Sequence, residues 1–170
     1  MRLKSALRRG VAAAVIAGIV VSSGIPAYAA PWNIADGDIT VKAGDTGNDV
    51  TQKGETTYGD TDTIITNQNK DIASSNTVTI ETNDKNDKVE VTLKDVNINV
   101  GSDSGSALTS NGDVTLTLKG DNHLTGGISG NGYGGSGIAS TGSLTISGGE
   151  TDSLTAQGGS GENGGDGISS

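Results

Sequence analysis

The residues best suited to chemistry lie in two short polar stretches, thirty residues apart. Asp121-Asn122 forms the first, and Thr151-Asp152, preceded by Glu150, forms the second. Calcium takes about six to eight oxygen ligands from carboxylates, amides and carbonyls. If the stretches stack at this offset, Asp121 lies opposite Thr151 and Asn122 opposite Asp152. A cation there would relieve the repulsion between the acids of neighbouring coils. The spacing therefore predicts a calcium site formed by Asp121, Glu150 and Asp152.

Three side chains are candidates for contact with a sugar. Tyr133 lies in the glycine-rich stretch 130–135, which is suited to presenting an aromatic ring. His123, the only histidine, and its neighbour Asn122 lie where one apolar run gives way to the next. We predict that Tyr133, Asn122 and His123 bind carbohydrate. The alternatives are that His123 is an exposed corner residue and that Tyr133 only shields the end of a coil.

Catalytic chemistry has little support in this sequence. A polysaccharide lyase needs a base together with cations that stabilise the developing charge, but every Arg lies within the first nine residues. A glycoside hydrolase needs two carboxylates that flank the scissile bond. Acids such as Asp95 and Asp113 are available, but acids at solvated corners usually serve solubility. We therefore expect a non-catalytic protein, with a degenerate polysaccharide lyase as the enzymatic alternative.

Residues 1–29 have the three parts of a secretory signal peptide. A basic start is followed by the apolar run 11–21 and by the small-residue pattern Ala27-Tyr28-Ala29. The apolar run has eleven residues, whereas a membrane-spanning helix needs about twenty. We expect cleavage after Ala29, secretion or attachment to the cell surface, and no membrane insertion afterwards.

The charge of the remaining chain limits its partners. Seven Lys oppose twenty Asp and Glu, which gives a net charge of −13 after residue 29. Nucleic acids and anionic membranes are bound through Lys and Arg, so neither is an expected partner. Cations and neutral sugars are compatible with this charge. Cysteine is absent, so packing and backbone hydrogen bonds must hold the fold together.

Short runs of alternating apolar and polar residues predict strands that position these side chains. The runs lie at 38–42, 63–66, 77–81, 89–93, 96–100, 114–118 and 143–147. We assign residues 30–60 to an N-terminal cap with the first strands, in which Trp32 covers the first coil. Residues 61–170 are assigned to stacked coils.

A gapless repeat supports the assignment of coils. Residues 106–116 match 136–146, and 134–140 match 164–170, both at an offset of thirty, while 89–94 match 114–119 at twenty-five. Three strands in each coil of 25–30 residues predict an all-β, right-handed, three-sided parallel β-helix. An antiparallel sandwich is the alternative, but sandwiches lack such a repeat.

The repeat also predicts which side chains stack inside the helix. One expected ladder contains Val78, Leu108, Ile138 and Ile168, and another pairs Leu124 with Leu154. The closing stretch 163–170 repeats the start of a coil, so we expect a β-helix that is truncated at the C-terminus. Its last coil would be an open strand edge that frays or pairs with another chain.

Several stretches are similar to a known family. The early Trp32 and the stretches 91–98, 114–126, 143–148 and 153–159 follow its coil patterns, such as "V-T-L-x-L-x-G-x-N-x-L-x-G" in the second. The chain resembles the carbohydrate-binding, polysaccharide-lyase-like β-helix family of secreted and surface proteins from anaerobic Gram-positive bacteria. The resemblance implies binding of polysaccharide, including acidic sugars, with calcium involved. A structural or adhesive stalk at the cell surface is the alternative.

Overall fold

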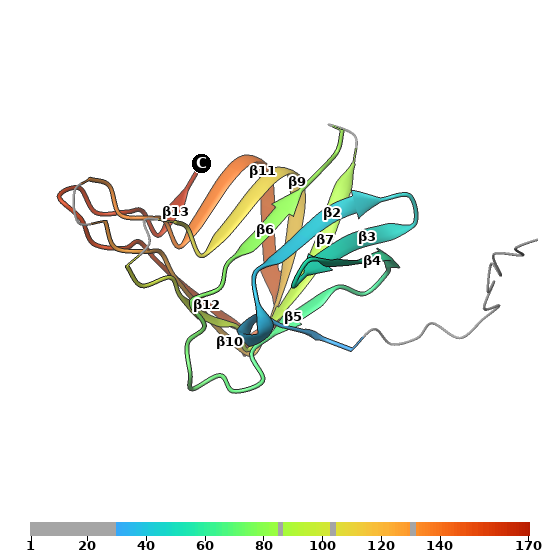
Figure 1. Cartoon of the computed structure of the whole chain (residues 1–170), viewed down its shortest axis with the longest axis horizontal. Coiled ribbons are helices and arrows are strands. Elements are labelled where there is room, and N and C mark those ends of the chain that lie inside the picture. Colours follow the sequence, from blue (N-terminus) through green and yellow to red (C-terminus); the bar gives the residue numbers. More distant parts are fainter. Residues whose placement is uncertain (1–29, 85–86, 103–104, 130–131) are drawn as a thin grey trace, which may run out of the picture.

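Parallel strands stacked in successive coils form the described part of the chain (Figure 1). The computed structural model describes residues 30–84, 87–102, 105–129 and 132–170. They form a β-solenoid of about four turns, which confirms the predicted parallel β-helix. The predicted signal peptide, residues 1–29, lies outside the described residues. None of the described residues belongs to a helix that is long and apolar enough to cross a membrane.

The elements follow one another as short strands with a single short 3₁₀ helix, η1 (Ile34–Asp36), in the described residues. The strands are β1 (Trp32–Asn33), β2 (Ile39–Gly44), β3 (Gly47–Gln52), β4 (Glu55–Asp60), β5 (Ile64–Thr66), β6 (Val78–Glu81), β7 (Lys88–Lys94), β8 (Asn97–Asn99), β9 (Leu108–Lys119), β10 (Asp121–Thr125), β11 (Ile138–Gly148), β12 (Ser153–Gln157) and β13 (Ile168–Ser169).

The solenoid has three sides, of which two merge into one sheet. The first half of β9 pairs with β6 on the first side, and its second half pairs with β7 on the second side, so β9 spans both sides. β11 pairs with β9 along its whole length. The change of side falls at the paired Gly112 and Gly142, whose φ angles of 99° and 119° favour glycine. The third side is a separate sheet in the order β12-β10-β8.

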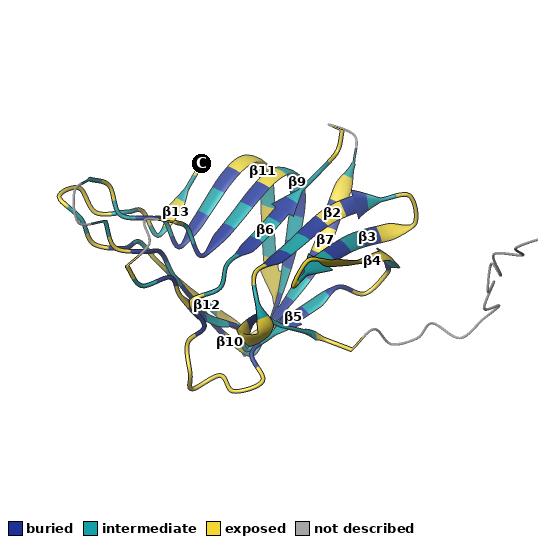
Figure 2. Cartoon of the chain, viewed as in Figure 1, coloured by how far each residue is buried: buried dark blue, intermediate teal, exposed yellow. Residues whose placement is uncertain are grey.

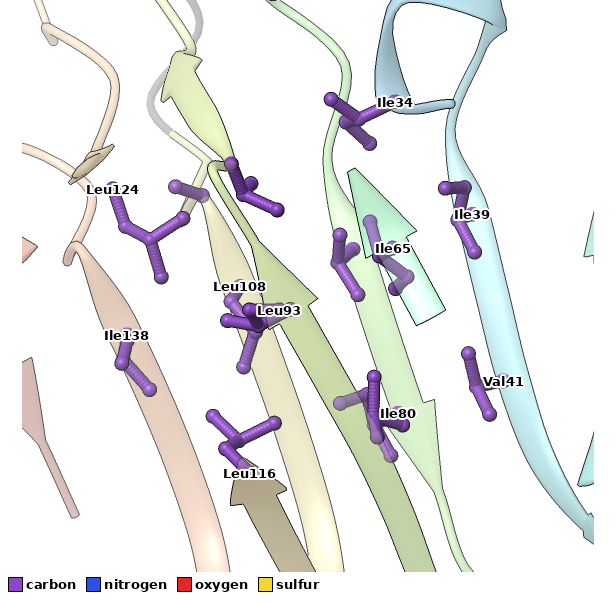
Figure 3. Close-up of a cluster of buried hydrophobic side chains, with 14 of the residues drawn as sticks. Ile34, Ile39, Val41, Ile65, Ile80, Leu93, Leu108, Leu116, Leu124 and Ile138 are labelled. Atoms are coloured by element: carbon purple, nitrogen blue, oxygen red, sulfur yellow. The ribbon is translucent and has the colours of Figure 1, made fainter. Parts of the chain in front are cut away.

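Branched apolar side chains fill the interior in stacked ladders. Val78, Leu108, Ile138 and Ile168 lie in register, which confirms the predicted ladder. Alternate residues along strands such as β6 and β7 are buried (Figure 2), and the close-up shows the clustered Leu, Ile and Val side chains (Figure 3). Leu108 and Ile138 are fully buried, and each buried side chain of this kind contributes about 1.5–3 kcal/mol.

The second predicted ladder is wrong. Leu124 lies opposite Ala156, and Leu154 lies opposite Asn122. The cause is the turn into β12. Four residues, 149–152, separate Gly148 from Ser153, whereas only Lys119 and Gly120 separate their partners Leu118 and Asp121. The turn is thus longer by two residues, and the shorter loop after β12 restores the thirty-residue offset at Ile168.

The N-terminal residues take part in the coils of the solenoid and add two antiparallel strands to its sheet. β1 pairs with β5 and β2 pairs with β6, both in parallel, so these two strands already belong to the ladders. The antiparallel pairs β2–β3 and β3–β4 extend the sheet beyond β2. Trp32 is partly buried and packs against the core, and its role as a cap of the first coil stays a prediction.

Glycine-rich loops extend together to one side of the solenoid (Figure 1). We call residues 126–129, 132–137 and 158–167 the glycine flange. Its segments pack backbone against backbone: the N–H of Gly135 donates to the Gly127 carbonyl, and the N–H of Gly159 donates to the Gly135 carbonyl, both at 2.8 Å. A Cβ at Gly159 would overlap the carbonyl oxygen of Gly127. This glycine is required for close approach rather than for a turn.

Candidate functional site

The outer surface of the third side is a flat array of polar side chains. Because side chains alternate along a strand, apolar residues of β8, β10 and β12 point inward and their polar neighbours point outward. The register forms rows across three coils. We call this surface the polar face, and its residues are Asn97, Asn99, Asp121, His123, Thr125, Ser153, Thr155 and Gln157.

A groove of about 390 Å³ borders the polar face. Asn99, Thr125 and Gln157, which form one row of the polar face, line one part of it. The glycine flange supplies most of the remaining lining, with Ile128 and Ser160 among its residues. A groove of this volume is within the range of small-molecule sites.

His123 and Asn122 are adjacent in sequence but lie on opposite sides of the sheet. His123 is exposed, and it lies between Asn97 and Thr155 in a row of the polar face. Asn122 is fully buried. Its position is a correction to the prediction, because an inward, fully buried amide does not contact a ligand on the outer face.

The buried Asn122 amide joins three successive coils. Its Oδ1 accepts a hydrogen bond from the Val96 N–H at 3.0 Å. Its Nδ2 donates to the carbonyl oxygens of Lys119 and Ser153, both at 3.2 Å. A buried amide is costly unless it is hydrogen-bonded, and here the bonds connect backbone groups of β10 with those of the coils on either side. The role of Asn122 is therefore structural.

Tyr133 projects from the glycine flange. It is 75% exposed, and it forms an isolated parallel bridge with Asn163 of the next coil. Tyr133 is not among the residues that line the groove. His123 lies on β10, a strand that also lines part of the groove. Tyr133 lies on the projecting loops instead.

The predicted stacking of Asp121 on Thr151 and of Asn122 on Asp152 is wrong, because the two extra turn residues shift the register. Asp121 lies opposite Ser153, whose Oγ donates to its carboxylate at 2.9 Å. Asp152 accepts hydrogen bonds from the N–H groups of Gly120 and Gly149, each at 2.7 Å. Glu150 is exposed in the same turn. The described part of the chain has no cluster of three His, Cys, Asp or Glu side chains placed to hold a metal ion, and calcium dependence stays a prediction.

The Asp152 carboxylate is expected to make stability depend on pH. The backbone N–H groups of Gly149 and then Gly120 hold the pKa of Asp152 below its ordinary value of 3.8. A lowered folded-state pKa gives stability that is present above the unfolded value and is lost as pH falls through the folded value. Asp152→Asn should therefore lower the urea midpoint at pH 7, and the difference from wild type should shrink below about pH 4.

Urea unfolding of Asp152→Asn and of the control Glu150→Gln, at pH 7 and at about pH 3, checks this expectation. Glu150 is exposed in the same turn, so its substitution should leave the midpoint unchanged at both values. A deficit of Asp152→Asn that persists undiminished at the lower pH would show that the carboxylate charge is not responsible.

Sequence reasoning missed the three side chains of the polar face that line the groove. Asn99, Thr125 and Gln157 each occupy an outward position at or near the end of a strand. Their outward direction could have been read from the alternation in each run, but their common row required the register of β12.

The fold and the polar face define the chain as a parallel β-solenoid with an exposed polar sheet on its third side. No protein-family model matches the chain, and no curated protein or solved structure is significantly similar to it. The family resemblance described from the sequence patterns accordingly stays a prediction.

Proposed function

We propose that the chain is an exported, non-catalytic polysaccharide-binding domain, whose ligand lies along the polar face and enters the adjoining groove. The observation that carries this proposal is the row Asn99, Thr125 and Gln157, which is shared by the polar face and the groove. Secretion is supported by the signal-peptide pattern of residues 1–29.

The polar face suits an extended glycan because its hydrogen-bonding groups repeat from coil to coil. Neighbouring strands of a sheet lie about 4.8 Å apart, so each row offers amide, hydroxyl or imidazole groups at a regular spacing. His123, with Asn97 and Thr155, forms one such row. Glycan hydroxyls donate and accept hydrogen bonds, and neutral side chains of these types can do both.

The charges of the polar face favour a neutral glycan. Asp121 is the only carboxylate among its eight residues, and none of the eight is Lys or Arg. The carboxylate of an acidic sugar would meet a chain of net charge −13, and it would need a bridging cation. Calcium is thus an expected requirement for acidic glycans, but not for neutral ones.

A glycan array, probed with and without calcium and with a chelator, tests the proposal. Thr155→Ala/Gln157→Ala removes two groups of the polar face and should weaken retention about tenfold or more, because each lost hydrogen bond contributes about 1 kcal/mol. The matched control is Thr145→Ala/Ser147→Ala, since these exposed residues occupy β11, on the second side. The control should bind like wild type.

The other outcomes separate the competing functions. If no glycan is retained in either condition, polysaccharide binding is excluded, and the structural or adhesive stalk, favoured by the unbroken ladder from Val78 to Ile168, takes its place. Release of unsaturated sugar, detected by its ultraviolet absorbance, would instead show a polysaccharide lyase. Equal losses in the two double variants would place the binding surface elsewhere on the chain.

A further inference from the structure

A second pocket lies at the N-terminal end of the solenoid, and none of its lining residues belongs to the polar face. Its volume is about 390 Å³. It is formed where β1 and η1 meet the hairpin of β3 and β4, and it combines an aromatic ring with amide, hydroxyl and carboxylate groups. The lining residues are Ala30, Pro31, Trp32, Asn33, Asp36, Gln52 and Thr57.

The indole ring of Trp32 is held in place by the hairpin. Its Nε1 donates to Oδ2 of Asp60 at 2.9 Å, and Asp60 is itself only 6% exposed. The other carboxylate oxygen of Asp60 accepts from the Asp62 N–H at 3.1 Å. The ring is thus oriented before any ligand arrives, so binding against it sacrifices little conformational entropy.

Hydrogen bonds also fix the orientation of Gln52, a polar side chain of this pocket. Nε2 of Gln52 donates to the carbonyl oxygens of Asn33 and Gly37, at 2.8 and 2.9 Å. These bonds set the plane of the Gln52 amide and connect β3 with the chain on both sides of η1. Asp36 lies 3.5 Å from the Lys53 ammonium, so its charge is partly compensated.

We infer that this pocket is a second carbohydrate subsite, for a neutral pyranose ring. Such a ring has an apolar face, which fits the indole of Trp32, and a rim of hydroxyls, which fits Gln52 and Thr57. The ligand class rests on the proposed function, but the residues are different from those of the polar face. Trp32 is on β1, in the first coil, whereas the polar face belongs to later coils on the third side.

The intrinsic fluorescence of Trp32 reports directly on this pocket, because Trp32 is the only tryptophan of the chain. We expect hexasaccharides of β-1,4-linked glucose or xylose to shift its emission saturably, with a dissociation constant of the order of 1 mM. Thr57→Lys places a long side chain at the pocket and should abolish the shift. Thr56→Lys, on the opposite face of the same strand, should retain it.

The outcomes distinguish this inference from the proposed function. A shift that survives Thr155→Ala/Gln157→Ala but not Thr57→Lys supports a separate subsite, even if no polysaccharide is retained by the polar face. Absence of any shift up to about 10 mM sugar overturns the subsite while leaving the polar face unaffected. A shift that Thr57→Lys does not alter also overturns it, because the change in emission would then arise outside this pocket.

Discussion

Replacing Gly159 with alanine is expected to destabilise the glycine flange and to lower the free energy of unfolding by about 3 kcal/mol. Gly159 is buried between three other backbone segments. Its N–H donates to Gly135, and its carbonyl accepts from Gly165, both at 2.8 Å. A methyl group would overlap the Gly127 carbonyl, so the segments must separate and both hydrogen bonds must lengthen. Gly159 also lines the groove, and we expect glycan retention to fall together with stability.

The matched control is Gly164→Ala, which makes the same change within the same flange. Gly164 is exposed, and the nearest atom to its Cβ position is 3.9 Å away. Its effect on urea unfolding should stay within about 0.5 kcal/mol. Similar unfolding free energies for the two variants would contradict the close backbone packing described for the flange.

Asn122→Ala is expected to cost about 3 kcal/mol of unfolding free energy. The substitution leaves the Val96 N–H without its acceptor and removes the amide donor from the Lys119 and Ser153 carbonyls. Because Asn122 is fully buried, water cannot easily replace the lost bonds. The coils containing β8, β10 and β12 should be the first to open.

The control for this prediction is His123→Ala, at the next residue but on the outer face. His123 is exposed, so its loss should change stability by less than about 0.5 kcal/mol while it weakens glycan retention. Hydrogen exchange provides the local measurement: the Val96 amide should exchange faster in Asn122→Ala and at the wild-type rate in His123→Ala. If the Val96 amide stays equally protected in both variants, the assigned role of Asn122 is wrong.

The ladder through Ile168 could be predicted from sequence because the repeat has no gaps, so the repeat itself shows which residues stack. Leu108 and Ile138 occupy equivalent positions in gapless repeats, and parallel coils place equivalent residues above one another. The final Ile therefore had only one inward partner, Ile138, and the structure pairs the two.

The register of the third side could not be predicted in the same way. The turn before β12 is longer by two residues, and the loop after it is shorter by two, so the overall offset of thirty hides the local shift. That shift separates Leu154 from Leu124, and it places Ser153 rather than Thr151 opposite Asp121. When one loop of a coil is longer and the next is shorter by the same number of residues, the repeat length does not change. The repeat length therefore cannot reveal the shift.

The inward direction of Asn122 was hidden by its polar neighbours. Asp121 and His123 flank it, so the tripeptide suggested a fully exposed turn, whereas the alternation Asn122, Leu124 places both side chains inside. The requirement for Gly159 also leaves no sequence pattern, because this glycine is required where another backbone lies at its Cβ position.

Mapping of amide chemical shifts by NMR tests the central claim most directly. An oligosaccharide of the best-retained glycan is titrated into the labelled chain, and the shifted amides are assigned. The account predicts that the largest changes fall on β8, β10 and β12, with the groove residues Asn99, Thr125 and Gln157 among them. Changes confined to the first two sides of the solenoid, with the third side unaffected, would contradict it.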